Sequence, residues 1–242
     1  MKHNSTVGII GAMDIEIAKL TAALDEVQEE LVAGLTFYVG KLKARPVIVV
    51  KSGIGKVNAA RCTQVMIDRY GVDYIINTGI AGGLDPSLAI GDIVIAQGLV
   101  QHDFDISAFG YAKGYLATGI NKDQPTLFLP DETVSKQLED SAAELISRTK
   151  IKKGLIATGD QFISQRDKKE ELRVDFSAMA AEMESCAIAQ VASLNNIPFA
   201  IIRAISDLAD GTAAESYEVF EREAAELSAE ILEHLLTKLD HE

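Results

Sequence analysis

Two glutamates, Glu182 and Glu184, lie on either side of Met183 in the run AAEMESCAIAQVASL (residues 180–194), which is otherwise largely apolar. Carboxylates are rarely buried unless hydrogen bonds or opposite charges compensate for the lost hydration. Glu16 and Asp207 are two further acids in segments rich in glycine or apolar residues. Carboxylates held in a pocket can donate and accept protons, so these four side chains are candidates for general acid and base chemistry.

Each acid also has a plainer interpretation. Glu16 lies where the first turn of a helix is expected, and the helix dipole favours a carboxylate there. Asp207 could cap the segment that follows AIS, and Asp210 is typical of a turn. Glu182 and Glu184 would point to nearly opposite faces of a helix but share a face of an extended segment. Both can therefore face one pocket if the helix begins near Glu184, and the apolar residues around them disfavour a solvated face.

Familiar cofactor and metal motifs do not account for these acids. GIGKVN, residues 53–58, has Asn58 where the third glycine of a dinucleotide-binding fingerprint would lie, and no Ser or Thr follows its lysine as a P-loop requires. The four histidines, at positions 3, 102, 234 and 241, are not spaced with cysteines or acids as metal ligands are. The sequence therefore predicts no metal site, and there is no G-x-S-x-G nucleophile motif.

Composition narrows the class of protein. The chain has 242 residues, 48% hydrophobic and 24% charged, which suits one large α/β domain. Acids outnumber bases 36 to 23, and the net charge of −13 argues against nucleic acid or an anionic membrane surface as the main partner. The first residues, MKHNSTVGIIGAM, lack the long apolar stretch typical of a signal peptide, and no run approaches ~20 apolar residues, so no membrane-spanning segment is expected. Cys62 and Cys186 lie far apart without a CxxC, which predicts reduced thiols in a cytoplasmic protein.

Short apolar runs alternate with helical patterns, which predicts an α/β fold with a central mixed sheet flanked by helices. The expected strands are residues 7–10, 35–40, 46–50, 73–77, 92–96, 155–159 and 198–206. The expected helices are a segment after Gly11 with Ile17, Leu20, Leu24 and Val27 at helical spacing, residues 57–70 and 131–148, the 180–194 run, and a last helix with an apolar stripe from Phe220 to Leu239. No linker or repeat is visible, so a single domain is expected over residues 1–242.

Ligands of such sheets bind at the carboxyl ends of strands. Five expected strands end in segments that contain glycines or acids: residues 11–16, SGIG (52–55), TGIAGG (78–83), TGDQF (158–162) and SDLAD (206–210). We expect these five segments to form one composite pocket.

Seven stretches, in order along nearly the whole chain, resemble the bacterial 5'-methylthioadenosine/S-adenosylhomocysteine nucleosidases: GIIGAMDIE (8–16), SGIGKVNAA (52–60), NTGIAGGL (77–84), DISAFGY (105–111), GDQFI (159–163), AEMESCAIA (181–189) and RAISDLAD (203–210). The resemblance implies a nucleoside phosphorylase-like fold, a homodimer, a nucleoside as the small-molecule substrate, and no metal or organic cofactor. It also implies hydrolysis of the adenine N-glycosidic bond with water as the nucleophile.

The resemblance assigns a role to each acid. Asp207 faces adenine N7 and is the general acid, and Glu16 is the base that activates water. Glu184 binds the ribose hydroxyls, and negative charge near C1' favours a cationic transition state. Glu182 is a supporting acid near the water.

Supporting and binding roles come from the same resemblance. Arg203 orients the acids, and Ser206 positions Asp207. Phe162 stacks on adenine, and the Ile163 backbone contacts its edge. The sugar packs on Met183, and the slot for the 5' group is formed by Met13, Ile54, Met183, Tyr217 and Phe220, with Ile106 and Phe109 supplied by the partner subunit.

One position departs from the family pattern. Ile80 stands where the family usually has the serine of TGSAGG, so a hydroxyl that could fix ribose or water is missing. Ala81 and Gly82 keep the backbone turn, and we expect activity to survive with a changed rate or a changed preference for the 5' group.

Three other functions stay open. A purine or uridine phosphorylase of the same fold would need arginines and amides around phosphate, whereas Asp14 and Glu16 in the first loop would repel an anion. A non-catalytic nucleoside-binding module would retain its ligand intact. QHDFDISAFGY and ATGDQF also resemble relatives that cleave 6-amino-6-deoxyfutalosine, and 5'-deoxyadenosine is a further candidate substrate.

Overall fold

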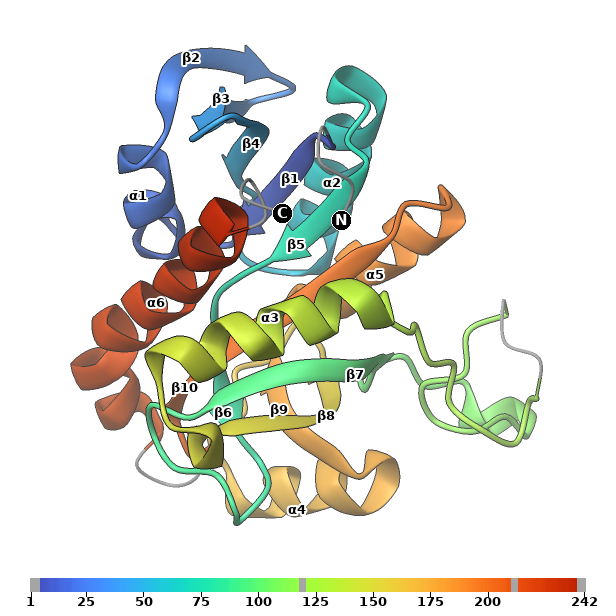
Figure 1. Ribbon diagram of the computed structural model, residues 1–242. Helices are drawn as coiled ribbons and strands as arrows, with labels where there is room; N and C mark the ends of the chain where they lie inside the picture. Colours follow the sequence, from blue (N-terminus) through green and yellow to red (C-terminus); the bar gives the residue numbers. More distant parts are fainter. Residues whose placement is uncertain (1–4, 118–120, 210–212, 239–242) are drawn as a thin grey trace.

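A mixed ten-stranded sheet forms the centre of the protein (Figure 1). The structure is a computed structural model that describes residues 5–117, 121–209 and 213–238, except the side chains of residues 213–216, 218 and 238. Its strands are β1 (Val7–Gly11), β2 (Asp25–Val32), β3 (Leu35–Leu42), β4 (Arg45–Lys51), β5 (Tyr74–Asn77), β6 (Ile80–Gly83), β7 (Ile93–Gln101), β8 (Ile151–Thr158), β9 (Ala178–Glu182) and β10 (Phe199–Asp207). Its helices are α1 (Asp14–Ala22), α2 (Lys56–Tyr70), α3 (Glu132–Leu145), α4 (Arg166–Phe176), α5 (Ser185–Leu194) and α6 (Ala213–Lys238), with short 3-10 helices η1 (Ser107–Phe109) and η2 (Arg148–Lys150).

The strands follow the order β2-β3-β4-β1-β5-β10-β6-β9-β8-β7, and β7 pairs with β10 as well. β10 runs parallel to β5 and β6 but antiparallel to β7, so the part of the sheet from β10 to β7 closes on itself. Strands covered on both faces require continuous apolar runs, and every residue of β10 is buried. The predicted α/β class with a central mixed sheet is confirmed.

Helices cover both faces of this sheet. Successive residues of a strand point to opposite faces, and Ile9 and Ile10 of β1 accordingly belong to two different cores. Ile9 packs in the core formed with α1, α3 and α6, which includes Leu20, Leu138 and Leu232. None of the helices within the described ranges has both the length and the apolar character needed to cross a bilayer.

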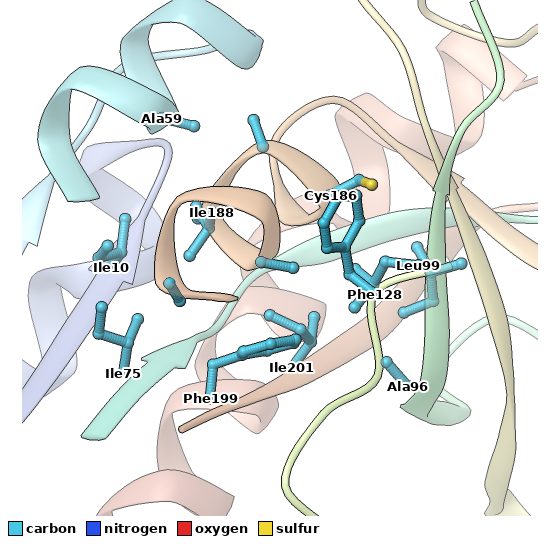
Figure 2. Close-up of a cluster of buried hydrophobic side chains, with 14 of the residues drawn as sticks. Ile10, Ala59, Ile75, Ala96, Leu99, Phe128, Cys186, Ile188, Phe199 and Ile201 are labelled. Atoms are coloured by element: carbon cyan, nitrogen blue, oxygen red, sulfur yellow. The ribbon is translucent and has the colours of Figure 1, made fainter. Parts of the chain in front are cut away.

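The second core lies between the sheet and the pair α2 and α5 (Figure 2). Ile188 of α5 lies between Ala59 of α2 and the strand residues Ile10 and Ile75, and Ile201 of β10 continues the same apolar layer. This layer holds α5 firmly on the sheet, and the start of α5 is where two of the candidate acids lie.

The first helix is shorter than the apolar spacing predicts. α1 ends at Ala22, so the prediction that Leu24 and Val27 continue it is wrong, and Val27 belongs to strand β2. β2 is an exposed edge strand held by backbone pairing with β3, and Val27 is 42% exposed. Because none of its residues is fully buried, its apolar residues do not follow the period-two pattern that predicts a strand.

The 180–194 run contains a strand and a helix, so the alternative in which Glu182 is extended and the helix begins near Glu184 is confirmed. Its first residues belong to β9, Glu184 is the N-cap residue, and α5 begins at Ser185. β6 and α4 are absent from the predicted elements, because β6 is the glycine-containing IAGG and α4 is mostly charged. The other predicted elements are present with small shifts at their ends, whereas Asp210 and Leu239 lie outside the described residues.

Candidate active site

One cavity of about 500 Å³ is surrounded by all five predicted strand-end segments, together with the end of β9 and Tyr217 of α6. The residues that were predicted from the sequence and line this cavity are Met13, Glu16, Ile54, Ala81, Gly82, Phe162, Ile163, Glu182, Met183, Glu184, Ser206, Asp207 and Tyr217. Ala12, Ile80, Gln161 and Ala181 line it as well. Four carboxylates from distant parts of the chain therefore share one space.

Glu16 is held at the cavity by backbone amides from two segments. One carboxylate oxygen accepts hydrogen bonds from the amides of Ala12 (2.6 Å) and Met13 (3.0 Å), and the other accepts from the amide of Ile80 (3.1 Å). Gly79 passes so close that a Cβ there would overlap this carboxylate. Burial raises the pKa of Glu16, and the charge of Arg203 and the amide hydrogen bonds oppose that shift only in part. The same carboxylate thus helps to begin α1 and faces the cavity.

Glu182 lies in a dense hydrogen-bond network at the end of β9. One oxygen accepts a hydrogen bond from Thr158 Oγ1, and the other accepts from the amides of Glu184 (3.0 Å) and Ser185 (2.8 Å). Arg203 Nη2 lies 2.8 Å from that second oxygen. Burial alone would raise the pKa of Glu182, but the charge of Arg203 and these hydrogen bonds outweigh it and hold the pKa below its ordinary value. Glu182 is therefore ionised.

Arg203 contacts Glu182 without lining the cavity. Its guanidinium donates to Asn77 Oδ1 at the end of β5, and that oxygen also accepts a hydrogen bond from Ser185 Oγ at 3.0 Å. Asn77 in turn donates to the carbonyl oxygen of Ile10 at 2.7 Å. Asn77 and Ser185 contact the guanidinium from β5 and α5, and Asn77 is itself held by Ile10 of β1. The sheet and the start of α5 therefore fix the position of the guanidinium.

Glu184 has a different environment from Glu182, although the two are equally buried at 7% exposure. Its Oε1 accepts a hydrogen bond from the amide of Gly55 at 2.8 Å. Burial, together with the negative charge of Glu182, raises the pKa of Glu184 to about 8. At neutral pH the pair therefore holds one ionised and one protonated carboxyl group.

Asp207 ends β10 and is 1% exposed. Its Oδ1 accepts a hydrogen bond from the amide of Ala209 (2.8 Å), which is an Asx turn, and its Oδ2 accepts from Ser206 Oγ (3.0 Å). The register of β10 against β6 shifts between Ile205 and Asp207. Such an irregularity redirects side chains at the end of a strand, and both Ser206 and Asp207 line the cavity.

The mouth of the cavity is apolar and partly open. Phe162 and Tyr217 meet edge to face with ring centroids 5.8 Å apart, and Tyr217 Oη lies 3.2 Å from Met13 Sδ. Phe162 is 49% exposed and Ile54 is 52% exposed. Ile80 lines the cavity and also packs in the core shared by α1, α3 and α6. The site thus combines buried acids with apolar side chains near the solvent, which suits a small ligand with a polar centre and one apolar group.

Besides Arg203, three predicted site residues do not line the cavity of their own chain. Phe220 lies on α6 and is not among the described lining residues. Ile106 and Phe109 lie in the segment after β7, where Phe109 is 80% exposed. Within the part of the chain that the structure describes, no group of three or more His, Cys, Asp or Glu side chains is arranged to hold a metal ion.

Several residues of this site were not singled out from the sequence. Thr158, Asn77 and Ser185 support Glu182 and Arg203, and Gln161 lines the cavity. All four lie inside motifs that were noted, TGDQF, NTGIAGGL and AEMESCAIA. Position within a motif was therefore a usable signal, but the hydrogen-bond partners depend on strands that are distant in sequence.

A family model for the phosphorylase superfamily matches residues 6–237. The chain belongs to the phosphorylase superfamily. The 5'-methylthioadenosine/S-adenosylhomocysteine nucleosidase of Shewanella loihica is 42% identical to this superfamily member over 234 residues, which are 96% of this chain and 99% of the relative. The resemblance to the bacterial nucleosidases is confirmed.

Solved structures agree with this placement in the superfamily. The nucleosidase from S. pneumoniae, with the transition-state inhibitor MT-ImmA, has a TM-score of 0.89 and 42% identity and covers 97% of this chain and 100% of its own. A futalosine hydrolase mutant of Helicobacter pylori has a TM-score of 0.90 and 33% identity and covers 97% of this chain and 99% of its own.

Proposed function

We propose that this protein hydrolyses the N-glycosidic bond of 5'-methylthioadenosine and S-adenosylhomocysteine, releasing adenine and the 5-substituted ribose. The observation that carries the proposal is the convergence of Glu16, Glu184 and Asp207 on one cavity with an apolar mouth. A relative that is 42% identical over nearly the whole chain is named for this activity. The protein is an enzyme of the N-glycosyl hydrolase type.

The reaction needs a proton for the departing base and a deprotonated water for the sugar. We assign Asp207 to protonate adenine N7, so that the C1'–N9 bond breaks with its electron pair going to a neutral base. Glu16 then takes one proton from the water that bonds to C1'. A raised pKa suits this role, because it makes the carboxylate a stronger base for the proton of the water.

The sugar carries positive charge as the bond breaks. We assign Glu184 to the ribose hydroxyls, with Met183 beneath the sugar, and the ionised Glu182 supplies negative charge nearby. Arg203 orients Glu182 and Ser206 orients Asp207, and each role fits the hydrogen bond that the residue donates to its acid. These roles explain why acids with such different pKa shifts are held in one cavity.

Binding of the base and of the 5' group is assigned to less polar residues. Phe162 would stack on adenine, while the Ile163 backbone reads its edge and Ala81 and Gly82 form the floor of the turn beside it. The 5' group would lie among the apolar residues Met13, Ile54, Tyr217 and Phe220. Of these, Phe220 has the weakest support, because it does not line the cavity in the single chain.

We further propose a homodimer in which each partner supplies Ile106 and Phe109 to the 5' slot of the other. Phe109 is 80% exposed in the single chain, and a large exposed aromatic side chain is typical of an interaction surface. A cytoplasmic location is supported by the two buried free thiols, Cys62 and Cys186.

The test of the reaction type is to supply methylthioadenosine with and without inorganic phosphate and to identify the sugar. Hydrolysis gives adenine and methylthioribose at rates that do not depend on phosphate. Formation of a ribose 1-phosphate would assign the protein to the phosphorylases, and intact nucleoside after long incubation would make it a binding module.

A second candidate substrate is 6-amino-6-deoxyfutalosine, which the structural likeness to a futalosine hydrolase favours. The two substrates share the adenine and ribose and differ at the 5' position. A comparison of kcat/KM for methylthioadenosine, S-adenosylhomocysteine, 5'-deoxyadenosine and aminodeoxyfutalosine decides between them. We expect the two thio-nucleosides to be cleaved most efficiently, and a clear preference for aminodeoxyfutalosine would overturn that order.

A further inference from the structure

Three residues beside the cavity form a closed ring of contacts between three loops, through their side chains and two backbone amides. Lys56 Nζ lies 2.6 Å from Asp103 Oδ1, and Asp103 Oδ2 accepts a hydrogen bond from the amide of Asp160 at 2.9 Å. Asp160 Oδ1 accepts from the amide of Lys56 at 2.8 Å, which closes the ring. The three residues are not among those that line the cavity. The catalytic assignments above leave this ring without a role.

The ring is partly shielded from water. The side chains of Lys56 and Asp103 are 18% and 17% exposed, and Lys56 Nζ also contacts Gln101 Oε1 at 3.1 Å. Burial would raise the pKa of Asp103, but the hydrogen bonds from Lys56 and Asp160 outweigh it and hold the pKa below its ordinary value. Removing one partner of a shielded, hydrogen-bonded ion pair costs more stability than removing one partner of an exposed pair. The ring therefore holds its three loops in place.

Two of the three loops joined by the ring carry part of the site. Gly55 directly precedes Lys56, and its amide donates to Glu184. Residues 161–163 directly follow Asp160 and line the cavity where adenine is assigned. A Cβ at Gly55 would lie 3.0 Å from Asp160 Oδ1, which shows how closely the two loops approach. The ring therefore joins the loop that holds the acid assigned to ribose to the loop assigned to the base.

A buried histidine packs at the same junction. His102 precedes Asp103, is 4% exposed, and has no hydrogen-bond partner at either ring nitrogen among the described residues. A Cβ on Gly159 would overlap its ring. Burial lowers the pKa of His102, so its imidazole is neutral. The flat imidazole packs against the start of the 159–163 loop.

We propose that Lys56, Asp103 and Asp160 are positioning residues that hold the ribose-binding acid and the adenine-binding loop at a fixed separation. That Glu184 binds ribose and that residues 161–163 bind adenine rests on the proposed function. The ring itself makes a prediction about coupling: once one contact is broken the ring is open, so breaking a second contact adds little.

The experiment compares Asp103→Ala, Asp160→Ala and the double variant, with the dissociation constant of adenine and the KM for methylthioadenosine as readouts. We expect each single variant to weaken adenine binding and raise KM by about tenfold, and the double variant to lie within about twofold of the weaker single. Asp175→Ala is the matched control, because Asp175 also contacts a lysine, Lys113, at 2.7 Å but does not line the cavity. It should bind adenine as the wild type does.

Two results would overturn the inference: wild-type adenine binding in both single variants, or single effects that multiply in the double variant. Asp103→Asn, which keeps the size of the side chain but not its charge, replaces Asp103→Ala if that variant does not fold. Hydrogen–deuterium exchange without ligand provides a readout that does not depend on the substrate. Opening the ring should speed exchange in both segments 53–57 and 159–163, and faster exchange in only one of them would also contradict the coupling.

The two proposals can fail separately. A wild-type protein that cleaves neither thio-nucleoside would remove the proposed function, whereas the exchange data would still decide whether the ring couples the two loops.

Discussion

Buried carboxylates at this site differ in their partners more than in their burial. Glu16, Glu182 and Glu184 are 4%, 7% and 7% exposed, yet the pKa is raised for Glu16 and Glu184 and lowered for Glu182. Only Glu182 contacts a guanidinium directly, through Arg203. The direct contact with Arg203, together with the hydrogen bonds from Thr158 and Ser185, therefore keeps Glu182 ionised, whereas burial outweighs the more distant charge of Arg203 at Glu16 and Glu184.

Asp207→Asn should abolish most turnover while the protein still folds and binds ligand. Asn has nearly the same volume and can still accept the hydrogen bond from the Ala209 amide, but it cannot donate a proton to the base. We expect kcat to fall by at least about 100-fold. Steady-state kinetics check kcat, and calorimetry checks adenine binding. Wild-type kcat in this variant would remove Asp207 from the role of general acid.

Glu184 makes stability depend on pH in a defined direction. Its pKa of about 8 in the folded protein lies above the ordinary value of 4.5, so the folded protein keeps a proton that the unfolded chain releases. Stability is therefore lost as pH rises from 4.5 to about 8. Glu184→Gln has no such proton to lose. As pH rises through this window, the Tm of the variant should therefore increase relative to the Tm of the wild type.

Scanning calorimetry of the ligand-free proteins at a series of pH values measures this difference. Glu223→Gln on α6 is the control, because Glu223 is exposed and should follow the wild type at every pH. Parallel Tm curves for Glu184→Gln and the wild type would show that Glu184 is not protonated near neutral pH.

At the scale of elements, burial decided which segments the sequence could predict. Strands such as β5 and β10 are apolar because both of their faces are covered, and their positions were predicted to within a few residues. β2 escaped prediction because its edge position leaves it mostly exposed, and β6 because two of its four residues are glycine. The boundary between β9 and α5 was left open, since both elements are apolar and pattern alone does not separate them.

The turn between β5 and β6 controls Glu16. A Cβ at Gly79 would overlap the Glu16 carboxylate, whose Oε1 also accepts a hydrogen bond from the adjacent amide of Ile80. Gly79→Ala should therefore displace this carboxylate and lower kcat by about tenfold or more. Gly98→Ala is the matched control, because a Cβ there meets its neighbours only at ordinary distances of 3.7 and 3.8 Å.

Steady-state kinetics and a thermal melt of both glycine variants separate a local effect from unfolding. Full activity in Gly79→Ala would mean that the Glu16 carboxylate need not lie where the structure has it.

At the scale of the whole molecule, sequence motifs predicted where the site lies but not which of its residues contact one another. The five strand-end segments were predicted to meet because the carboxyl ends of strands share one edge of a sheet. The link from Arg203 to Asn77, and the ring formed by Lys56, Asp103 and Asp160, depend on which strands are neighbours. Strand order was not predictable from one sequence, because the apolar runs of buried strands are interchangeable.

The proposed dimer can be tested by mixing two impaired variants. Asp207→Asn lacks the acid but keeps Phe109, and Phe109→Ala keeps the acid but lacks the aromatic side chain offered to the partner. In a mixed dimer, one of the two sites has both groups intact. After equal mixing and subunit exchange, about a quarter of all sites should regain wild-type kinetics.

Activity at low substrate concentration, before and after mixing, measures this recovery, and sedimentation should give about twice the chain mass of 26.1 kDa. A mixture that is only as active as the average of its two components would show that Phe109 does not complete the site of a second copy.

The pairing of β7 with β10 closes one part of the sheet, while among the described residues β2 pairs only with β3 and forms the open end. β2 contains Asp25, Glu26, Glu29 and Glu30 and no lysine or arginine. Two copies that approached each other along this rim would bring like charges together, which discourages fibre-like stacking. Acidification would neutralise that barrier, so light scattering should rise as pH falls through the ordinary carboxylate range, and Glu29→Gln, which removes one of the four negative charges, should shift the rise to a higher pH.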